Sequence, residues 1–65
     1  MKILLGQLMY KRELSVRQVE ILTGVTKSTV SRIAGEEISP TMDTMEALAK
    51  GLKVKISDLY DSPYK

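Results

Sequence analysis

The sequence contains no cysteine, no histidine, no tryptophan and no phenylalanine. Without cysteine the chain forms no disulfide and offers no thiolate to a metal ion. Without histidine it lacks the commonest general base and the commonest metal ligand. Apart from the adjacent Glu36 and Glu37, its carboxylates are scattered singly, and no catalytic pair is predicted. We therefore expect no enzyme, no catalytic residues, no metal and no cofactor.

Long apolar runs are also absent. The apolar segment at residues 3–5 is too short for the core of a signal peptide, and no run approaches the roughly 20 residues that a membrane span needs. We expect a cytoplasmic protein with no membrane partner. A length of 65 residues favours one domain over residues 1–65, with an ordered core at about 2–60 and a short tail at 61–65.

Charge of one sign is concentrated on part of the chain, although the net charge is only +2. Residues 11–32 carry five basic and two acidic residues, a net of +3, whereas residues 33–65 carry four basic and six acidic residues, a net of −2. A basic region of this kind is expected where one face meets phosphates. A solvated charged surface explains the same pattern equally well.

Helix start and stop signals divide the chain into five short segments, at about residues 2–12, 15–23, 27–34, 42–50 and 57–60. Ser15 begins a capping box with Gln18, Thr26 and Thr41 are further predicted N-caps, and Ser57 is expected to cap the last short turn. Gly24, Gly35 and Gly51 follow the second, third and fourth segments. No stretch alternates for long with the period of a strand, so the predicted fold class is all-α.

The junction of the second and third segments is the most informative feature. Val16 and Val19 share a face of the second segment, Val30 and Ile33 share a face of the third, and Val25 fills the turn. Two helices of about two turns joined by residues 23–25 must cross steeply. This arrangement predicts a helix-turn-helix.

The opposite face of the third segment has no large apolar residue. It offers short hydroxyls that can approach base edges and cations that can reach guanine or phosphate. Residues 24–35 include no acidic residue, although an ordinary surface helix usually carries some. Taken alone, a short helix rich in serine and threonine is more often solvated surface; its place after a glycine turn favours DNA binding. The residues of this face are Lys27, Ser28, Thr29, Ser31 and Arg32.

The stretch from residue 14 to residue 33, LSVRQVEILTGVTKSTVSRI, resembles the phage-repressor and Cro-like (XRE-type) helix-turn-helix family. The resemblance continues through residues 39–41, 43–54 and 56–59, and so covers about residues 5–60. It implies a compact five-helix domain whose third helix lies in the major groove of an operator in double-stranded DNA. The implied base-reading residues are Lys27, Ser28, Thr29, Ser31 and Arg32. The implied phosphate-contacting residues are Ser15, Arg17, Gln18 and Thr26.

Alternatives remain open for two of these residues, and three features depart from the family. Arg17 is either a phosphate contact or a solvated charge, and Gln18 either contacts DNA or is used in the capping box. Family members often carry glutamine where Val16 stands. They usually carry a small residue where Glu20 stands, so the larger Glu20 must bend toward solvent or pair with a cation. The acidic pair at residues 36–37 occupies a loop that is often basic, which puts phosphate binding by that loop in doubt.

The resemblance implies a transcriptional regulator of prokaryotic or phage origin, a repressor of phage or mobile-element type, working as a homodimer on DNA. The alternative is an antitoxin-like protein that binds a partner protein and regulates its own operon; a purely structural interaction module is a third reading.

Surplus apolar residues motivate self-association: Ile3, Leu4, Met9, Ile21, Leu22 and Ile38. The first choice for the dimer interface is the late segment, whose apolar residues either pair with a second copy or cap the core: Val54, Ile56, Leu59 and Tyr60.

Overall fold

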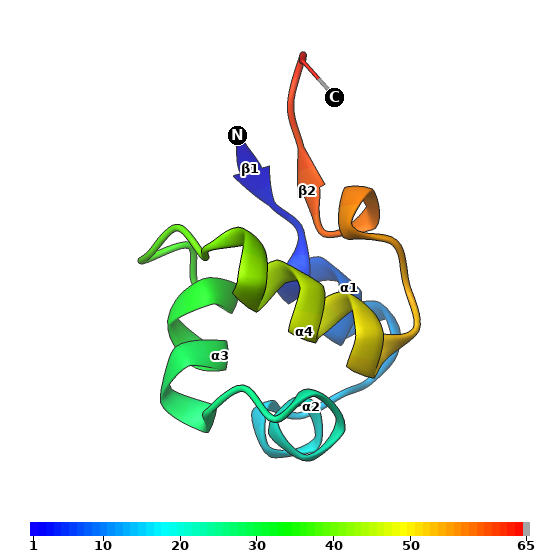
Figure 1. The fold of residues 1–65 in the computed structure, drawn as a ribbon. Coiled ribbons are helices and arrows are strands. Elements are labelled where there is room, and N and C mark those ends of the chain that lie inside the picture. The colour runs from blue at the N-terminus through cyan, green and yellow to red at the C-terminus, as the bar shows by residue number, and fades with distance from the viewer. Residues whose placement is uncertain (65) are drawn as a thin grey trace.

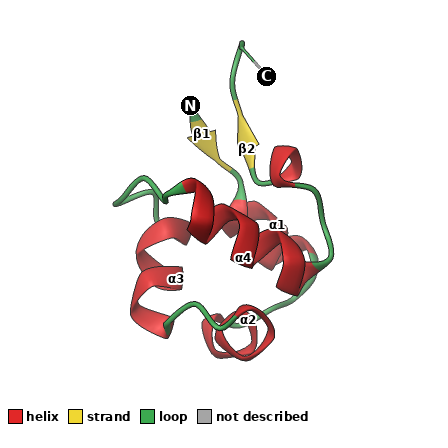
Figure 2. Ribbon diagram, viewed as in Figure 1, coloured by secondary structure: helices red, strands yellow, loops and turns green. Residues whose placement is uncertain are grey.

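The computed structural model describes residues 1–64, which form a mostly helical domain with a small two-stranded sheet (Figures 1 and 2). In Figure 1 the paired strands β1 and β2 lie at one end of the domain, and α2 lies at the opposite end. Within these residues the elements are β1 (Lys2–Ile3), α1 (Leu5–Lys11), α2 (Val16–Thr23), α3 (Lys27–Ala34), α4 (Met42–Leu52), the 3-10 turn η1 (Ile56–Asp58) and β2 (Tyr60–Asp61).

The predicted five-helix count is not confirmed, because the described residues form four α-helices and one 3-10 turn. A fifth helix was expected at residues 57–60, capped by Ser57. Instead η1 begins one residue earlier, and the backbone N–H of Lys55 donates a 3.0 Å hydrogen bond to Asp58 Oδ2. Residue 60 has already entered a strand, which leaves too little chain for an α-helix.

The helix starts follow the capping signals of the sequence. Ser15 Oγ accepts the N–H of Gln18 at 3.1 Å, and Gln18 Oε1 accepts the N–H of Ser15 at 2.7 Å, which completes the predicted capping box. Thr26 caps α3, and Thr41 caps α4 by accepting the N–H of Thr44 at 3.2 Å. These caps fix where α2, α3 and α4 begin.

The first helix is shorter than predicted because the chain before it pairs with the far end of the sequence. Lys2 lies opposite Asp61 and Ile3 opposite Tyr60 in an antiparallel ladder, and the N–H of Leu4 donates to the carbonyl of Leu59 at 2.8 Å. Asp61 thus belongs to a strand, one residue beyond the ordered core expected at 2–60. Within the tail expected at 61–65, Lys65 lies outside the described residues.

The fourth helix continues through Gly51, which was predicted to end it. Lys53 ends the helix instead, in the left-handed region at φ 57°. Gly51 has a different reason to be glycine: a Cβ atom there would lie 2.7 Å from Thr23 Cα and 2.6 Å from Thr23 Cγ2. The residue therefore lets α4 approach the end of α2 closely.

One apolar core joins all four helices and both ends of the chain. Val19, Val30, Ile33 and Leu48 are fully buried, and Leu59 is fully buried beside them. Leu59 is thus part of the core, whereas the other residues of the predicted late interface are half-buried against it: Val54, Ile56 and Tyr60. Among the surplus apolar residues, Ile3 and Met9 are buried, Leu4 is half-buried, and three are exposed: Ile21, Leu22 and Ile38.

Candidate nucleic-acid interface

Helices α2 and α3 are joined by a three-residue turn at residues 24–26. Gly24 has a φ of 78°, and a Cβ there would have nothing within 4 Å, so backbone conformation alone requires the glycine. Thr23 Oγ1 donates to the carbonyl of Val19 at 2.7 Å and accepts the N–H of Val25 at 3.2 Å. The turn is therefore fixed by a left-handed residue and by one hydroxyl.

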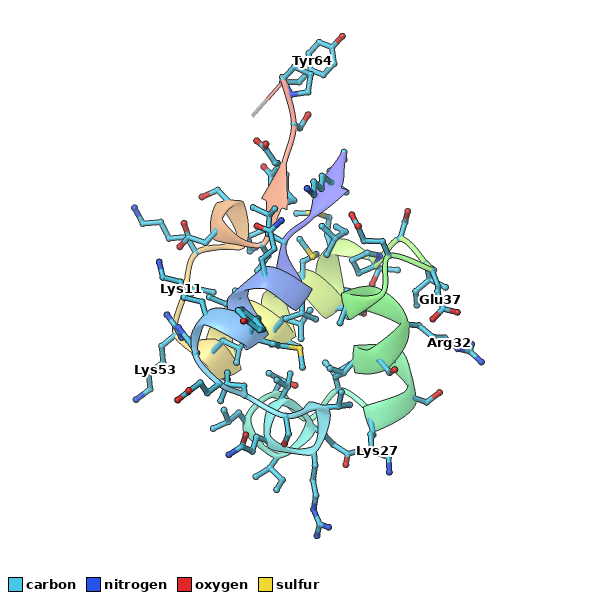
Figure 3. The ribbon with its side chains drawn as sticks, turned by 180° about the vertical axis from the view of Figure 1, so that it is seen from behind. Lys11, Lys27, Arg32, Glu37, Lys53 and Tyr64 are labelled. Carbon is cyan, nitrogen blue, oxygen red and sulfur yellow. The ribbon has the colours of Figure 1, made fainter. Side chains whose placement is uncertain are left out.

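The core sets the rotation of α3 about its own axis. Val30 and Ile33 are fully buried on its inner side, as the sequence predicts. Four exposed polar residues then lie on the other side: Lys27, Ser28, Ser31 and Arg32. Figure 3 shows the side chains of Lys27 and Arg32 extending outward from the two ends of α3. This exposed set, Lys27, Ser28, Ser31 and Arg32, is called the α3 face below.

A surface hollow of about 500 Å³ brings the α3 face together with two residues from neighbouring segments. Val16, at the start of α2, supplies an apolar wall, and Glu37, from the loop after α3, supplies a carboxylate. Cations, hydroxyls, one carboxylate and a small apolar surface therefore converge within reach of a single ligand. Such a set can donate to guanine, accept from amino groups and contact a methyl group.

Thr29, the fifth predicted base-reading residue, does not line the hollow. It is half-buried, and its hydroxyl lies 2.9 Å from the hydroxyl of Thr26. Thr26 Oγ1 also accepts the N–H of Thr29 at 3.4 Å. The two threonines are thus engaged with each other at the cap of α3.

The other predicted phosphate residues lie at the start of α2. Arg17 is exposed and extends the positive surface beyond the α3 face. Ser15 and Gln18 are exposed, but the side-chain oxygen of each already accepts the backbone N–H of the other in the capping box. The amide N–H₂ of Gln18 and the hydroxyl hydrogen of Ser15 are still donors that suit a phosphate.

Glu20 has a role that the sequence did not reveal. Its Oε2 accepts the backbone N–H of Lys27 at 2.8 Å, a main-chain partner rather than the solvent or the cation that the sequence suggested. The sequence signal was the charged residue at a position near the helix crossing. The partner of Glu20 is a main-chain N–H group, which cannot be predicted from residue types. Val16 and Glu37 were noted as departures from the family, and the structure adds that both line the hollow.

Other kinds of site find no support in the described part of the chain. No three His, Cys, Asp or Glu side chains among residues 1–64 gather where they could hold a metal ion. No helix within the same residues is long and apolar enough to cross a membrane. The α3 face contains four of the five predicted base-reading residues, all of them exposed.

Comparisons with known proteins agree with the helix-turn-helix formed by α2 and α3. The sequence model of the Cro/C1-type HTH DNA-binding domain matches residues 5–63. The HTH-type transcriptional regulator PuuR of Escherichia coli (strain K12) is 30% identical over 61 residues, which is 94% of this chain, and PuuR of Shigella flexneri matches equally. The match covers only 33% of each relative, so the chain spans about a third of their length. No solved structure matches the chain significantly.

Proposed function

Because this chain belongs to the Cro/C1-type helix-turn-helix DNA-binding domain family, we propose that it is a sequence-specific transcriptional regulator whose α3 enters the major groove of double-stranded DNA. Lys27 and Ser28 begin this helix, where base contacts are usually made, and Ser31 and Arg32 follow on the same face. Thr29 contributes less to base contacts, because its hydroxyl is hydrogen-bonded to that of Thr26.

The observation that carries the proposal is the two-sided character of α3. Its inner side is anchored by fully buried Val30 and Ile33, and its outer side presents only polar and cationic groups to the hollow. A rigid helix that offers hydroxyls and cations on an exposed face suits the major groove, which admits an α-helix and displays donors and acceptors in a pattern unique to each base pair.

Phosphate contacts are assigned to the segments on either side of the turn. Arg17 provides an exposed cation, Ser15 and Gln18 provide donors, and Thr26 lies at the start of α3. The N-terminus of a helix favours anions because its first N–H groups lack intrahelical partners. Such contacts fix the position of the protein on the duplex and carry no sequence information by themselves.

The protein acts as a homodimer on its operator and as a repressor of phage or mobile-element type in the cytoplasm. One short recognition helix reads few base pairs, and two copies on half-sites about one helical turn apart double the number that is read. Repression is then steric, because a protein that occupies the operator blocks polymerase. The relatives are named transcriptional regulators, which supports regulation of transcription as the outcome.

A second candidate function is an antitoxin-like protein that binds a partner protein and regulates its own operon through the same α3 face. Two adjacent apolar residues of α2 favour it, since Ile21 is 72% exposed and Leu22 is 51% exposed. The acidic residues Glu36 and Glu37 add a surface that suits protein better than phosphate. A neighbouring toxin gene in the same operon favours this candidate, whereas a divergent promoter with a second repressor favours the phage-type switch.

Selection from random double-stranded DNA with the purified protein, followed by footprinting at two salt concentrations, tests the proposal. We expect one sequence to be enriched, with a footprint of two related half-sites. Affinity should fall steeply as salt rises, because phosphate contacts release counterions. Enrichment of no sequence, or a complex insensitive to salt, contradicts the proposal.

A further inference from the structure

A single side chain of α2 holds the first residue of α3. Glu20 Oε2 accepts a 2.8 Å hydrogen bond from the backbone N–H of Lys27, seven residues later and across the turn. Glu20 is half-buried, in the second half of α2, and Lys27 is the first residue of α3. A carboxylate of one helix therefore caps the next helix.

Physical chemistry favours this contact in two ways. The first N–H groups of a helix have no partner within the helix, and the helix dipole places partial positive charge there, so a carboxylate is stabilising at this end. Thr26 satisfies a different group, the N–H of Thr29, at 3.4 Å. Two side chains, one from the turn and one from α2, thus each accept one of the free N–H groups at the start of α3.

The hydrogen bond also restrains the angle between the two helices. Gly24 and Thr23 define the path of the turn through hydrogen bonds to Glu20, Val19 and Val25. The side chain of Glu20 binds the main-chain N–H of Lys27, the first residue of α3. This hydrogen bond therefore resists rotation and tilt of α3 against α2. The held atom is the backbone nitrogen of Lys27. The side chains of Lys27 and Ser28, the first two residues of the α3 face, branch from the chain directly after this atom.

We infer that Glu20 is a positioning residue for DNA recognition: its carboxylate fastens the start of α3 to α2 and so sets the direction in which Lys27 and Ser28 project. The inference rests on the proposed role of α3 as the recognition helix. Glu20 itself contacts no base. Its charge weakly opposes binding to any DNA, and its oxygen acceptor favours binding to the correct sequence.

Two substitutions separate these effects. Glu20→Gln keeps a side-chain oxygen that accepts the N–H of Lys27 but removes the charge, whereas Glu20→Ala removes both. Glu46→Gln and Glu46→Ala are the matched controls, because Glu46 is an exposed glutamate of α4 that borders a different hollow, with Val54 and Ile56. Far-ultraviolet circular dichroism confirms that each variant is folded.

Amide hydrogen exchange of the DNA-free protein tests the contact itself. The Lys27 amide should exchange on the order of tenfold faster in Glu20→Ala than in the wild-type protein, because its hydrogen-bond acceptor is gone. In Glu20→Gln and in both Glu46 variants its exchange should stay close to the wild-type rate. An unchanged rate in Glu20→Ala overturns the inference without touching the proposed function.

Binding to two duplexes tests the role in recognition. One carries the sequence enriched by selection, and the other has the same length and base composition in shuffled order. Glu20→Ala should lower the ratio of the two affinities about tenfold, the scale of one lost hydrogen bond to a charged group. Glu20→Gln should keep the ratio within about twofold of wild type and bind both duplexes slightly more tightly.

Either of two results overturns the inference: Glu20→Ala discriminates as well as the wild-type protein, or Glu20→Gln loses discrimination as Glu20→Ala does. The second result assigns the effect to charge rather than to position. A wild-type protein that discriminates between no duplexes contradicts the proposed function instead, and the exchange rate of Lys27 then still reports on the contact.

Discussion

The guanidinium of Arg12 donates a hydrogen bond of 2.7 Å from Nη1 to the carbonyl oxygen of Leu52 and so fastens the end of α1 to the end of α4. Leu52 is the last residue of α4, where carbonyl groups lack intrahelical partners and the helix dipole favours a cation. The contact joins residues forty positions apart. It therefore helps to hold the scaffold that supports α2 and α3.

Replacing Arg12 by alanine should lower the free energy of unfolding by about 1 kcal/mol, because the Leu52 carbonyl loses a charged donor and gains only water. Urea denaturation followed by circular dichroism measures the change. Lys11→Ala is the control, since it removes the same charge from the adjacent exposed residue. Equal losses in the two variants would show that net charge matters rather than the hydrogen bond.

Replacing Gly51 by alanine should destabilise the protein, although alanine is the better helix former by about 1 kcal/mol. The new methyl group would overlap the backbone of Leu22 and Thr23, and we expect a net loss of about 2 kcal/mol. Thermal unfolding of Gly35→Ala provides the control, because the nearest atoms to its Cβ would lie at 3.4 Å. A Gly51→Ala protein as stable as the wild type would contradict the close approach of α4 and α2.

Arg17→Gln should weaken binding to the selected and shuffled duplexes by the same factor. A phosphate contact is insensitive to sequence, so its removal should also reduce the slope of log affinity against log salt by about one. Titrations at several salt concentrations measure both quantities. Wild-type affinity and slope in this variant would identify Arg17 as a solvated charge.

Glu37→Gln should tighten binding to any duplex, by about threefold. The carboxylate lines the same hollow as Lys27 and Arg32, where it repels the phosphates that those cations attract. Fluorescence anisotropy at low salt measures the effect, with Glu46→Gln as the control on α4. Unchanged binding by Glu37→Gln would mean that the loop after α3 turns away from DNA, and weaker binding would mean that the carboxylate accepts a hydrogen bond from a base.

Local signals in the sequence predicted much of the helical framework. Ser15, Thr26 and Thr41 cap helices as predicted, because a cap depends on residues three positions apart. Gly24 takes the left-handed conformation that the turn needs. The inward placement of Val30 and Ile33 follows from helical spacing, and with it the exposure of the opposite face.

Features that depend on distant parts of the chain were not predictable in the same way. The sequence predicted a first helix that begins at about residue 2, yet residues 2–3 pair with residues 60–61 as a strand. Gly51 suggested a helix end, and only the position of Thr23 explains why it lies inside the helix. The bond from Glu20 to Lys27 requires the geometry of the turn, which residue types alone do not specify.

The affinity ratio of Arg32→Ala for the selected and shuffled duplexes, against that of Lys53→Ala, tests the central claim most directly. Arg32 belongs to the α3 face, whereas Lys53 is an exposed lysine at the end of α4. If α3 reads bases, Arg32→Ala should lose about 1–3 kcal/mol of discrimination while Lys53→Ala keeps the wild-type ratio. A wild-type ratio in Arg32→Ala would contradict the assignment of Arg32 as a base-reading residue of the α3 face.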